Sequence, residues 1–180
     1  MTRGARISRR TFLRRTLAGA ALVGIGGTVL RHLTGYSLDE ATARRLRVLS
    51  RKEYLVLAAI CRRMLAPDEK GSIDPDTVGV ALVIDEQLTL LPEATVADVR
   101  ALLQLVEHSP FLFSLRPSRF SRLDAAGQEA VLAGWESSAL DFRRQCFAAL
   151  KGLAALGYYG DPRAYAVLGF TGPMLPNGGT

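Results

Sequence analysis

The 180-residue sequence has few of the side chains that enzymes use for metal binding and nucleophilic catalysis. It contains two cysteines, Cys61 and Cys146, and two histidines, His32 and His108. A metal site needs several converging His, Cys, Asp or Glu ligands, and metalloprotease, covalent-haem, nucleophile-elbow and phosphate-loop motifs are missing. We therefore expect no catalytic residue, no metal site and no cofactor site in this chain. A small enzyme with an unrecognised site around His108 is an alternative.

The sequence also lacks the alternation of apolar and polar residues that marks β-strands, and it contains no internal repeat. Apolar residues instead recur every three or four positions, which predicts an all-α protein. We expect a small, irregular bundle of about five helices. Four of them are predicted to start at the capping residues Ser50, Thr95, Asp124 and Ser138, a further helix spans about Asp76 to Leu90, and the last one ends at Gly157.

Positive charge is concentrated in the first 31 residues, which contain seven arginines and no acidic residue. The rest of the chain has 16 basic and 17 acidic residues, although the whole chain has a net charge of +6. A nucleic-acid-binding domain usually carries a basic patch of its own. We therefore expect no nucleic-acid partner, and we assign the excess charge to an N-terminal targeting segment.

Residues 1–31 have the layout of an export signal, a basic stretch followed by a short apolar stretch. The sequence SRRTFL resembles the twin-arginine (Tat) signal, which sends folded proteins to the Tat translocase. The residues that match are Ser8, Arg9, Arg10, Phe12 and Leu13. The apolar run that follows has 15 residues, fewer than the roughly 20 that cross a bilayer.

No Ala-x-Ala cleavage site follows this run, so the segment is either removed or kept as a membrane tether. Either outcome places the body in the periplasm or on the outer face of the cytoplasmic membrane. We divide the chain into a signal or anchor over 1–31, a linker over 32–48, a helical domain over 49–173 and a disordered tail over 174–180.

Both cysteines fall on predicted apolar helix faces, and an exported chain permits disulfides. Three alternatives are open: two buried free thiols, an internal disulfide between Cys61 and Cys146, or a bond from one cysteine to another chain. Spacing alone does not decide between them, because bridging depends on the distance between the two Cα atoms. The predicted core stripe around the second cysteine comprises Phe142, Cys146, Ala149, Leu150 and Leu153.

The C-terminal stretch LKGLAALGYYGDPRAYAVLGFTGP is rich in aromatic residues and in turn-forming glycine and proline. Such a tail either wraps around its own bundle or forms part of an interface, where aromatic side chains are common anchors. For the second case, the residues predicted to build the partner interface or the turn that shapes it are Tyr158, Tyr159, Asp161, Pro162, Tyr165, Gly169, Phe170, Gly172 and Pro173.

Five stretches of the chain together resemble the gluconate 2-dehydrogenase subunit 3 family. They are the SRRTFL leader, the helical segments LSRKEYLVLAAICRRMLAPD, FSRLDAAGQEAVLAGWESS and FRRQCFAALKGLAALGYYGDP, and the LGFTGP ending. The resemblance covers most of residues 49–173, with no firm landmark over about 70–118. It implies a non-catalytic small subunit of a flavin-dependent GMC (glucose–methanol–choline) oxidoreductase.

The resemblance further implies that FAD is held by the large subunit, which crosses the membrane as a passenger on the Tat leader of the small one. Electrons then pass to a haem-bearing cytochrome c subunit. Sugar acids, sugars and alcohols are the substrate classes implied for the partner. A standalone, membrane-tethered helical protein with a structural or ligand-binding role is the alternative from another class.

Overall fold

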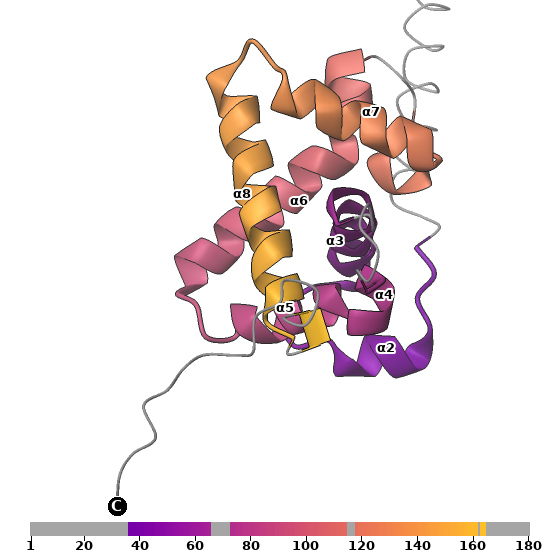
Figure 1. Cartoon of the computed structure of the whole chain (residues 1–180), viewed down its shortest axis with the longest axis vertical. Coiled ribbons are helices and arrows are strands. Elements are labelled where there is room, and N and C mark those ends of the chain that lie inside the picture. Colours follow the sequence, from indigo (N-terminus) through magenta and orange to yellow (C-terminus); the bar gives the residue numbers. More distant parts are fainter. Residues whose placement is uncertain (1–35, 66–72, 115–117, 162, 165–180) are drawn as a thin grey trace, which may run out of the picture. The chain divides into compact units, whose positions relative to one another are not determined.

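The structure, a computed structural model, describes residues 36–65, 73–114, 118–161 and 163–164. The chain divides into two units, 1–35 and 36–180, and all described residues belong to the second. Within them the secondary structure is helical, without strands, which confirms the all-α prediction. The helices are α2 (Glu40–Arg45), α3 (Arg51–Met64), α4 (Pro75–Val78), α5 (Val80–Leu88), α6 (Glu93–Ser114), η1 (Phe120–Arg122), α7 (Ala125–Glu136) and α8 (Asp141–Tyr159) (Figure 1).

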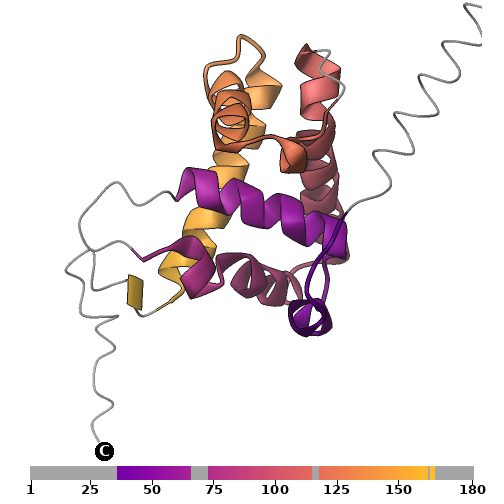
Figure 2. The same ribbon diagram turned by 90° about the vertical axis from the view of Figure 1, so that its right-hand side faces the viewer.

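Helix α3 runs through the middle of the bundle and contacts α5, α6, α7 and α8 (Figure 2). Its run from Val56 to Cys61 is buried without interruption, because neighbours cover it on several sides. The predicted capping box is present: Ser50 accepts from the backbone N–H of Glu53, whose carboxylate accepts from the backbone N–H of Ser50. A helix with an apolar surface of this width belongs at the centre of the core.

The single helix predicted over Asp76–Leu90 was wrong in its continuity, because the segment forms two helices, α4 and α5. Gly79 separates them with φ +73°, a left-handed conformation that glycine adopts without steric cost. The backbone N–H of Gly79 donates to the carbonyl groups of Pro75 and Asp76, and these hydrogen bonds end α4. The chain therefore turns at Gly79 before α5 enters the core.

Helix α6 starts at Glu93, so the capping box predicted at Thr95 and Asp98 was wrong and both residues lie inside the helix. The helix continues through Pro110, which has no N–H to donate to the carbonyl of Val106. The hydroxyl of Ser109 donates to that carbonyl at 2.8 Å instead. This bond satisfies the carbonyl that Pro110 leaves without its usual donor inside the 22-residue helix.

The last two helices differ in how well their ends were predicted. Asp124 caps α7 by accepting from the N–H of Gly127 at 2.9 Å, as expected. Helix α8, however, starts at Asp141 without a side-chain cap, because the hydroxyl of Ser138 accepts from Leu140 in the preceding turn. Nor does α8 end at Gly157, since it continues to Tyr159.

Gly157 lies where α8 passes closest to α5. A Cβ atom at this position would lie 2.6 Å from Cγ1 of Ile84 and 3.0 Å from Cγ1 of Val80. The glycine is therefore required by the close approach of the two helices and not by a turn in the chain. This contact sets the position of the C-terminal half of α8.

Candidate functional site

One side of α8 presents an uncharged, largely apolar surface that no other described element covers. Its residues recur at spacings of three and four, so they lie in one row along the helix. We call this row the α8 stripe; it consists of Phe142, Gln145, Ala149, Gly152, Leu156 and Tyr159. All six residues are exposed, and Phe142 and Leu156 each retain 59% of their accessible surface. The stripe contains no charged residue.

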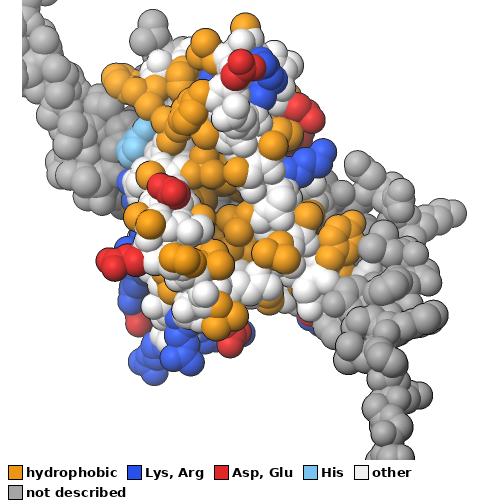
Figure 3. Space-filling view, turned by 90° about the vertical axis from the view of Figure 1, so that its left-hand side faces the viewer, with side chains coloured by type: hydrophobic (Ala, Val, Ile, Leu, Met, Phe, Trp, Pro, Cys, Tyr) orange, Lys and Arg blue, Asp and Glu red, His pale blue; other side chains and the backbone are white. Residues whose placement is uncertain are grey.

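A shallow groove of about 400 Å³ runs beside the first half of the stripe, between α8 and α6. Helix α6 contributes Ala101, Leu102 and Leu105 to it, and Asp98 is the one charged residue among the described residues that line it. Figure 3 shows this side of the molecule, on which hydrophobic side chains gather over the middle and charged ones lie mainly towards the edges. An apolar area with a polar rim is typical of a protein–protein contact.

The stripe corrects the predicted core face of α8. Of the five residues predicted to face inward, Leu150 is buried, Cys146 and Leu153 are half-buried, and Phe142 and Ala149 are exposed. The helix is apolar on two sides, since Lys151 is the single charged residue between Gln145 and Tyr159. That excess of apolar surface over what one core face needs was a signal in the sequence for a second contact.

The predicted interface residues at the end of α8 take different positions. Tyr158 is buried, and its hydroxyl both donates to the carbonyl of Ile73 at 3.1 Å and accepts from its N–H at 2.9 Å. Tyr159 packs edge-on against Tyr158, with ring centroids 5.2 Å apart, and is 42% exposed. Of this pair, Tyr158 stabilises the bundle through its contact with Ile73, and Tyr159 is exposed and available to contact a partner protein. The interface itself stays a prediction.

Asp161 follows α8 and accepts hydrogen bonds from the backbone N–H and the guanidinium of Arg163. The side-chain hydrogen bond from Arg163 lowers the pKa of Asp161 to about 2. Several predicted residues lie outside the described part of the chain: Ser8, Arg9, Arg10, Phe12, Leu13, Pro162, Tyr165, Gly169, Phe170, Gly172 and Pro173.

The two cysteines are free thiols in the structure, one buried and one half-buried, and a bond from either cysteine to another chain stays a prediction. Cys61 is buried in α3, and burial raises the pKa of its thiol to about 12. Cys146 is half-buried in the groove between α6 and α8, where burial also raises the pKa of its thiol. Neither environment activates a thiol as a nucleophile.

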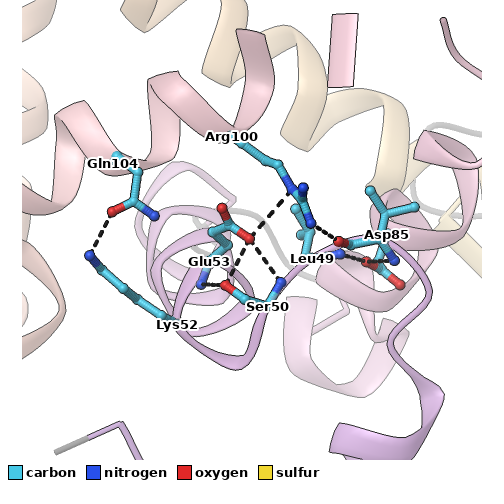
Figure 4. Close-up of polar contacts among 8 residues, drawn as sticks. Leu49, Ser50, Lys52, Glu53, Asp85, Arg100 and Gln104 are labelled. Atoms are coloured by element: carbon cyan, nitrogen blue, oxygen red, sulfur yellow. Dashed lines mark hydrogen bonds and ion pairs between the residues drawn. The ribbon is translucent and has the colours of Figure 1, made fainter. Parts of the chain in front are cut away.

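Titratable side chains gather at the start of α3, where their hydrogen bonds and ion pairs stabilise the fold (Figure 4). The buried carboxylate of Asp85 accepts from the backbone N–H groups of Arg47, Val48 and Leu49, at 2.6, 3.1 and 2.6 Å. The guanidinium of Arg100 donates to the carbonyl of Val48, and its Nε lies 3.6 Å from Glu53. These contacts bind the segment before α3 to α5 and α6.

A second buried cluster surrounds Glu107 in α6. Its carboxylate accepts from the hydroxyl of Tyr36 at 2.6 Å and from the backbone and side chain of Ser121, and Nε of Arg119 lies 3.7 Å away. The Arg119 guanidinium also stacks on the Tyr36 ring at 4.0 Å. Burial raises the pKa of Tyr36 above its usual value. The cluster attaches the first described residue to the core.

His108 lies beside this cluster, with Nε2 3.3 Å from Nζ of Lys52. Lys52 also donates to Gln104 at 2.6 Å, and desolvation lowers the pKa of its ammonium group. Within the described ranges, no three His, Cys, Asp or Glu side chains converge as a metal site would require. None of the helices described here is long and apolar enough to span a bilayer.

The family model described as gluconate 2-dehydrogenase subunit 3 matches residues 51–172, from the start of α3 to beyond the end of α8. No curated protein and no solved structure gives a significant match. The match covers well over half of the chain and includes both sides of the α6–α8 groove. The chain therefore belongs to the gluconate 2-dehydrogenase subunit 3 family.

Proposed function

We propose that this chain is a non-catalytic small subunit that binds a flavin-dependent GMC oxidoreductase and escorts it through the Tat pathway. Membership of the family implies a subunit of the dehydrogenase complex. FAD belongs to the large subunit in this proposal, and a cytochrome c subunit with haem receives the electrons. The partner acts on a sugar acid, a sugar or an alcohol, and gluconate is one member of that class.

The observation that carries the proposal is the uncharged, exposed α8 stripe with the apolar groove beside it. Aromatic and aliphatic side chains of this size are costly to leave in water, and removing apolar surface from water contributes about 25 cal/mol per Å². Phe142 and Leu156 stand at the two halves of the stripe, and the small residues Ala149 and Gly152 between them permit close approach of a partner element. A large subunit seated there would cover the stripe.

The leader supports the export part of the proposal. The SRRTFL sequence resembles a Tat signal, and that pathway carries proteins that are already folded. A flavoprotein must fold around its cofactor before export, so a signal on a bound partner would carry it across. The assembled complex would then reside in the periplasm or on the outer face of the cytoplasmic membrane, tethered there if the signal is retained.

The test is a pull-down of the tagged full chain from membrane and periplasmic fractions of its native host, with an absorption spectrum of the eluate. We expect a larger co-purifying chain and a flavin spectrum. Leu156→Glu should reduce recovery of that chain at least about tenfold, because it places a charge in the contact. Leu112→Glu is the matched control, since Leu112 is 54% exposed but lies on α6, outside the stripe.

A lone, colourless chain in the eluate would contradict the proposal and favour the standalone tethered protein. Equal recovery of the larger chain with Leu156→Glu and Leu112→Glu would show that a partner binds, but that the α8 stripe is not part of the contact. Circular dichroism of both variants checks that each keeps its helicity.

A further inference from the structure

A second hollow, separate from the α6–α8 groove, is lined by residues from the end of α6, from α7 and from the start of α8. Figure 1 shows where these three segments lie in the bundle. The volume of the hollow is about 320 Å³. The residues that line it are Ser109, Pro110, Phe113, Gly127, Ala130, Val131, Gly134, Trp135 and Arg143. Small residues of α7 at positions 127, 130 and 134 leave this space open on one side of that helix. The described residues of the lining include one cation and no carboxylate.

The cation, Arg143, lacks an acidic partner within the described residues. Its guanidinium lies over the rings of Phe113 and Trp135, 4.6 and 5.7 Å from their centroids. Its Nε is buried and donates no hydrogen bond. The adjacent Arg144, by contrast, pairs with Asp141 and with the carbonyl of Ser138. Because guanidinium groups normally donate to carboxylates or carbonyls, the buried Nε of Arg143 lacks the acceptor that such a group usually has.

Trp135 provides a second donor without an acceptor. The residue is 0% exposed, and its indole Nε1–H is buried with no hydrogen-bond partner in the described part of the chain. A buried indole N–H is normally paired. The other polar side chain of the hollow, Ser109, already donates its hydroxyl to Val106. Two residues that line one hollow therefore each have a buried, unpaired N–H group, and the guanidinium of Arg143 lies over the ring of Trp135.

We propose that this hollow binds a carboxylate group. A carboxylate is planar, anionic and an acceptor only, so it would supply the acceptor that Nε of Arg143 and the indole N–H of Trp135 lack. Phe113 and Val131 would contact the apolar part of the ligand. A phosphate dianion would place two negative charges beside a lining whose single cation is Arg143 among the described residues. The carboxylate comes either from a small organic acid or from an acidic side chain of a partner protein, and the site does not depend on the α8 stripe.

Fluorescence provides a direct test, because Trp135 is the only tryptophan in the sequence. The purified full chain is titrated with sodium propionate and with N-acetylglutamic acid α-amide, which presents a glutamate side chain. Sodium chloride, propionamide and sodium phosphate are the controls. We expect a saturable change in the emission of Trp135 with a carboxylate and none with the controls. Binding of the amide alone assigns the site to a partner's side chain, and binding of propionate as well assigns it to small acids.

The variants compare two adjacent arginines. Arg143→Gln should weaken carboxylate binding at least about tenfold, because it removes the cation. Arg144→Gln should change it less than about twofold, since that guanidinium already has acceptors. Thermal unfolding of both variants checks the fold, and Arg143→Lys, which keeps the charge without the planar fork, should bind with intermediate affinity.

Three results would overturn the proposal. The first is the absence of any saturable change with either carboxylate up to about 100 mM, which is weaker than a charge-assisted pair should bind. The second is equal binding by Arg143→Gln and the parent chain. The third is binding of phosphate as tight as that of propionate, because the donors would then serve anions in general.

Discussion

At the scale of single residues, we expect Asp85 to contribute more to the stability of the fold than an exposed acidic residue does. Its buried carboxylate is the acceptor for three consecutive backbone N–H groups, from Arg47 to Leu49. Asp85→Ala leaves these donors unpaired, so we expect the free energy of unfolding to fall by about 3 kcal/mol or more. Urea denaturation measures this, and Glu86→Ala, at the exposed neighbouring position, should change it by less than about 0.5 kcal/mol. Equal effects would remove this role from Asp85.

The buried thiol of Cys61 predicts how stability depends on alkaline pH. Burial raises its pKa from 9.0 to about 12, so the unfolded chain releases this proton first as the pH rises. The thiol therefore contributes stability below about pH 9 that is lost progressively towards pH 12. Its contribution to the slope is up to about 1.4 kcal/mol per pH unit.

Cys61→Ala isolates this contribution from that of the tyrosines, which titrate over the same range. The variant is less stable at neutral pH because it loses a packed side chain, but its stability should decline less steeply between pH 9 and 12. Chemical denaturation at each pH gives both slopes. Parallel curves would show that the Cys61 thiol is not protected from water.

At the scale of helices, the packing of α8 on α5 can be tested with two glycines of the same helix. Gly157→Ala places a methyl group 2.6 Å from Ile84, so we expect a loss of about 1–3 kcal/mol from overpacking. Gly152→Ala meets nothing within 4 Å, and the better helix propensity of alanine should add up to about 1 kcal/mol. Thermal unfolding of both variants measures the difference. Stabilisation by both would contradict the close contact.

The two faces of α8 have different roles. Leu150, Ala154 and Gly157 face the bundle, whereas the α8 stripe faces outward without a covering element among the described residues. An isolated helix needs only one apolar face to join a core. The second face is consistent with a subunit that is complete only in a complex.

At the scale of the whole molecule, the proposed escort role predicts joint export. Replacing both Arg9 and Arg10 by lysine keeps the charge of the leader but removes the twin-arginine pair. We expect this chain and its flavoprotein partner both to remain in the cytoplasm, measured by fractionation and immunoblotting. The control replaces Arg14 and Arg15 by lysine, which should leave export unchanged. Normal export of both proteins with the first variant would remove the Tat proposal.

The sequence by itself determined the fold class and several helix ends. The caps at Ser50 and Asp124 were predictable because each depends on a hydrogen bond to a residue three positions along the chain. Other ends were not. Thr95 and Ser138 are each followed three positions later by an acidic residue, as Ser50 is. Helix α6 nevertheless starts before Thr95, and the hydroxyl of Ser138 accepts a hydrogen bond within a turn.

Tertiary structure alone decided which surfaces face the core and which face outward. Periodicity places Phe142 and Leu150 on the same helix, but only the positions of the neighbouring helices bury Leu150 and expose Phe142. The acceptor role of Asp85 and the close approach at Gly157 likewise join residues more than 30 positions apart. Local hydrogen bonds can be recognised within one helical turn of sequence, whereas burial depends on contacts that only the folded chain brings together.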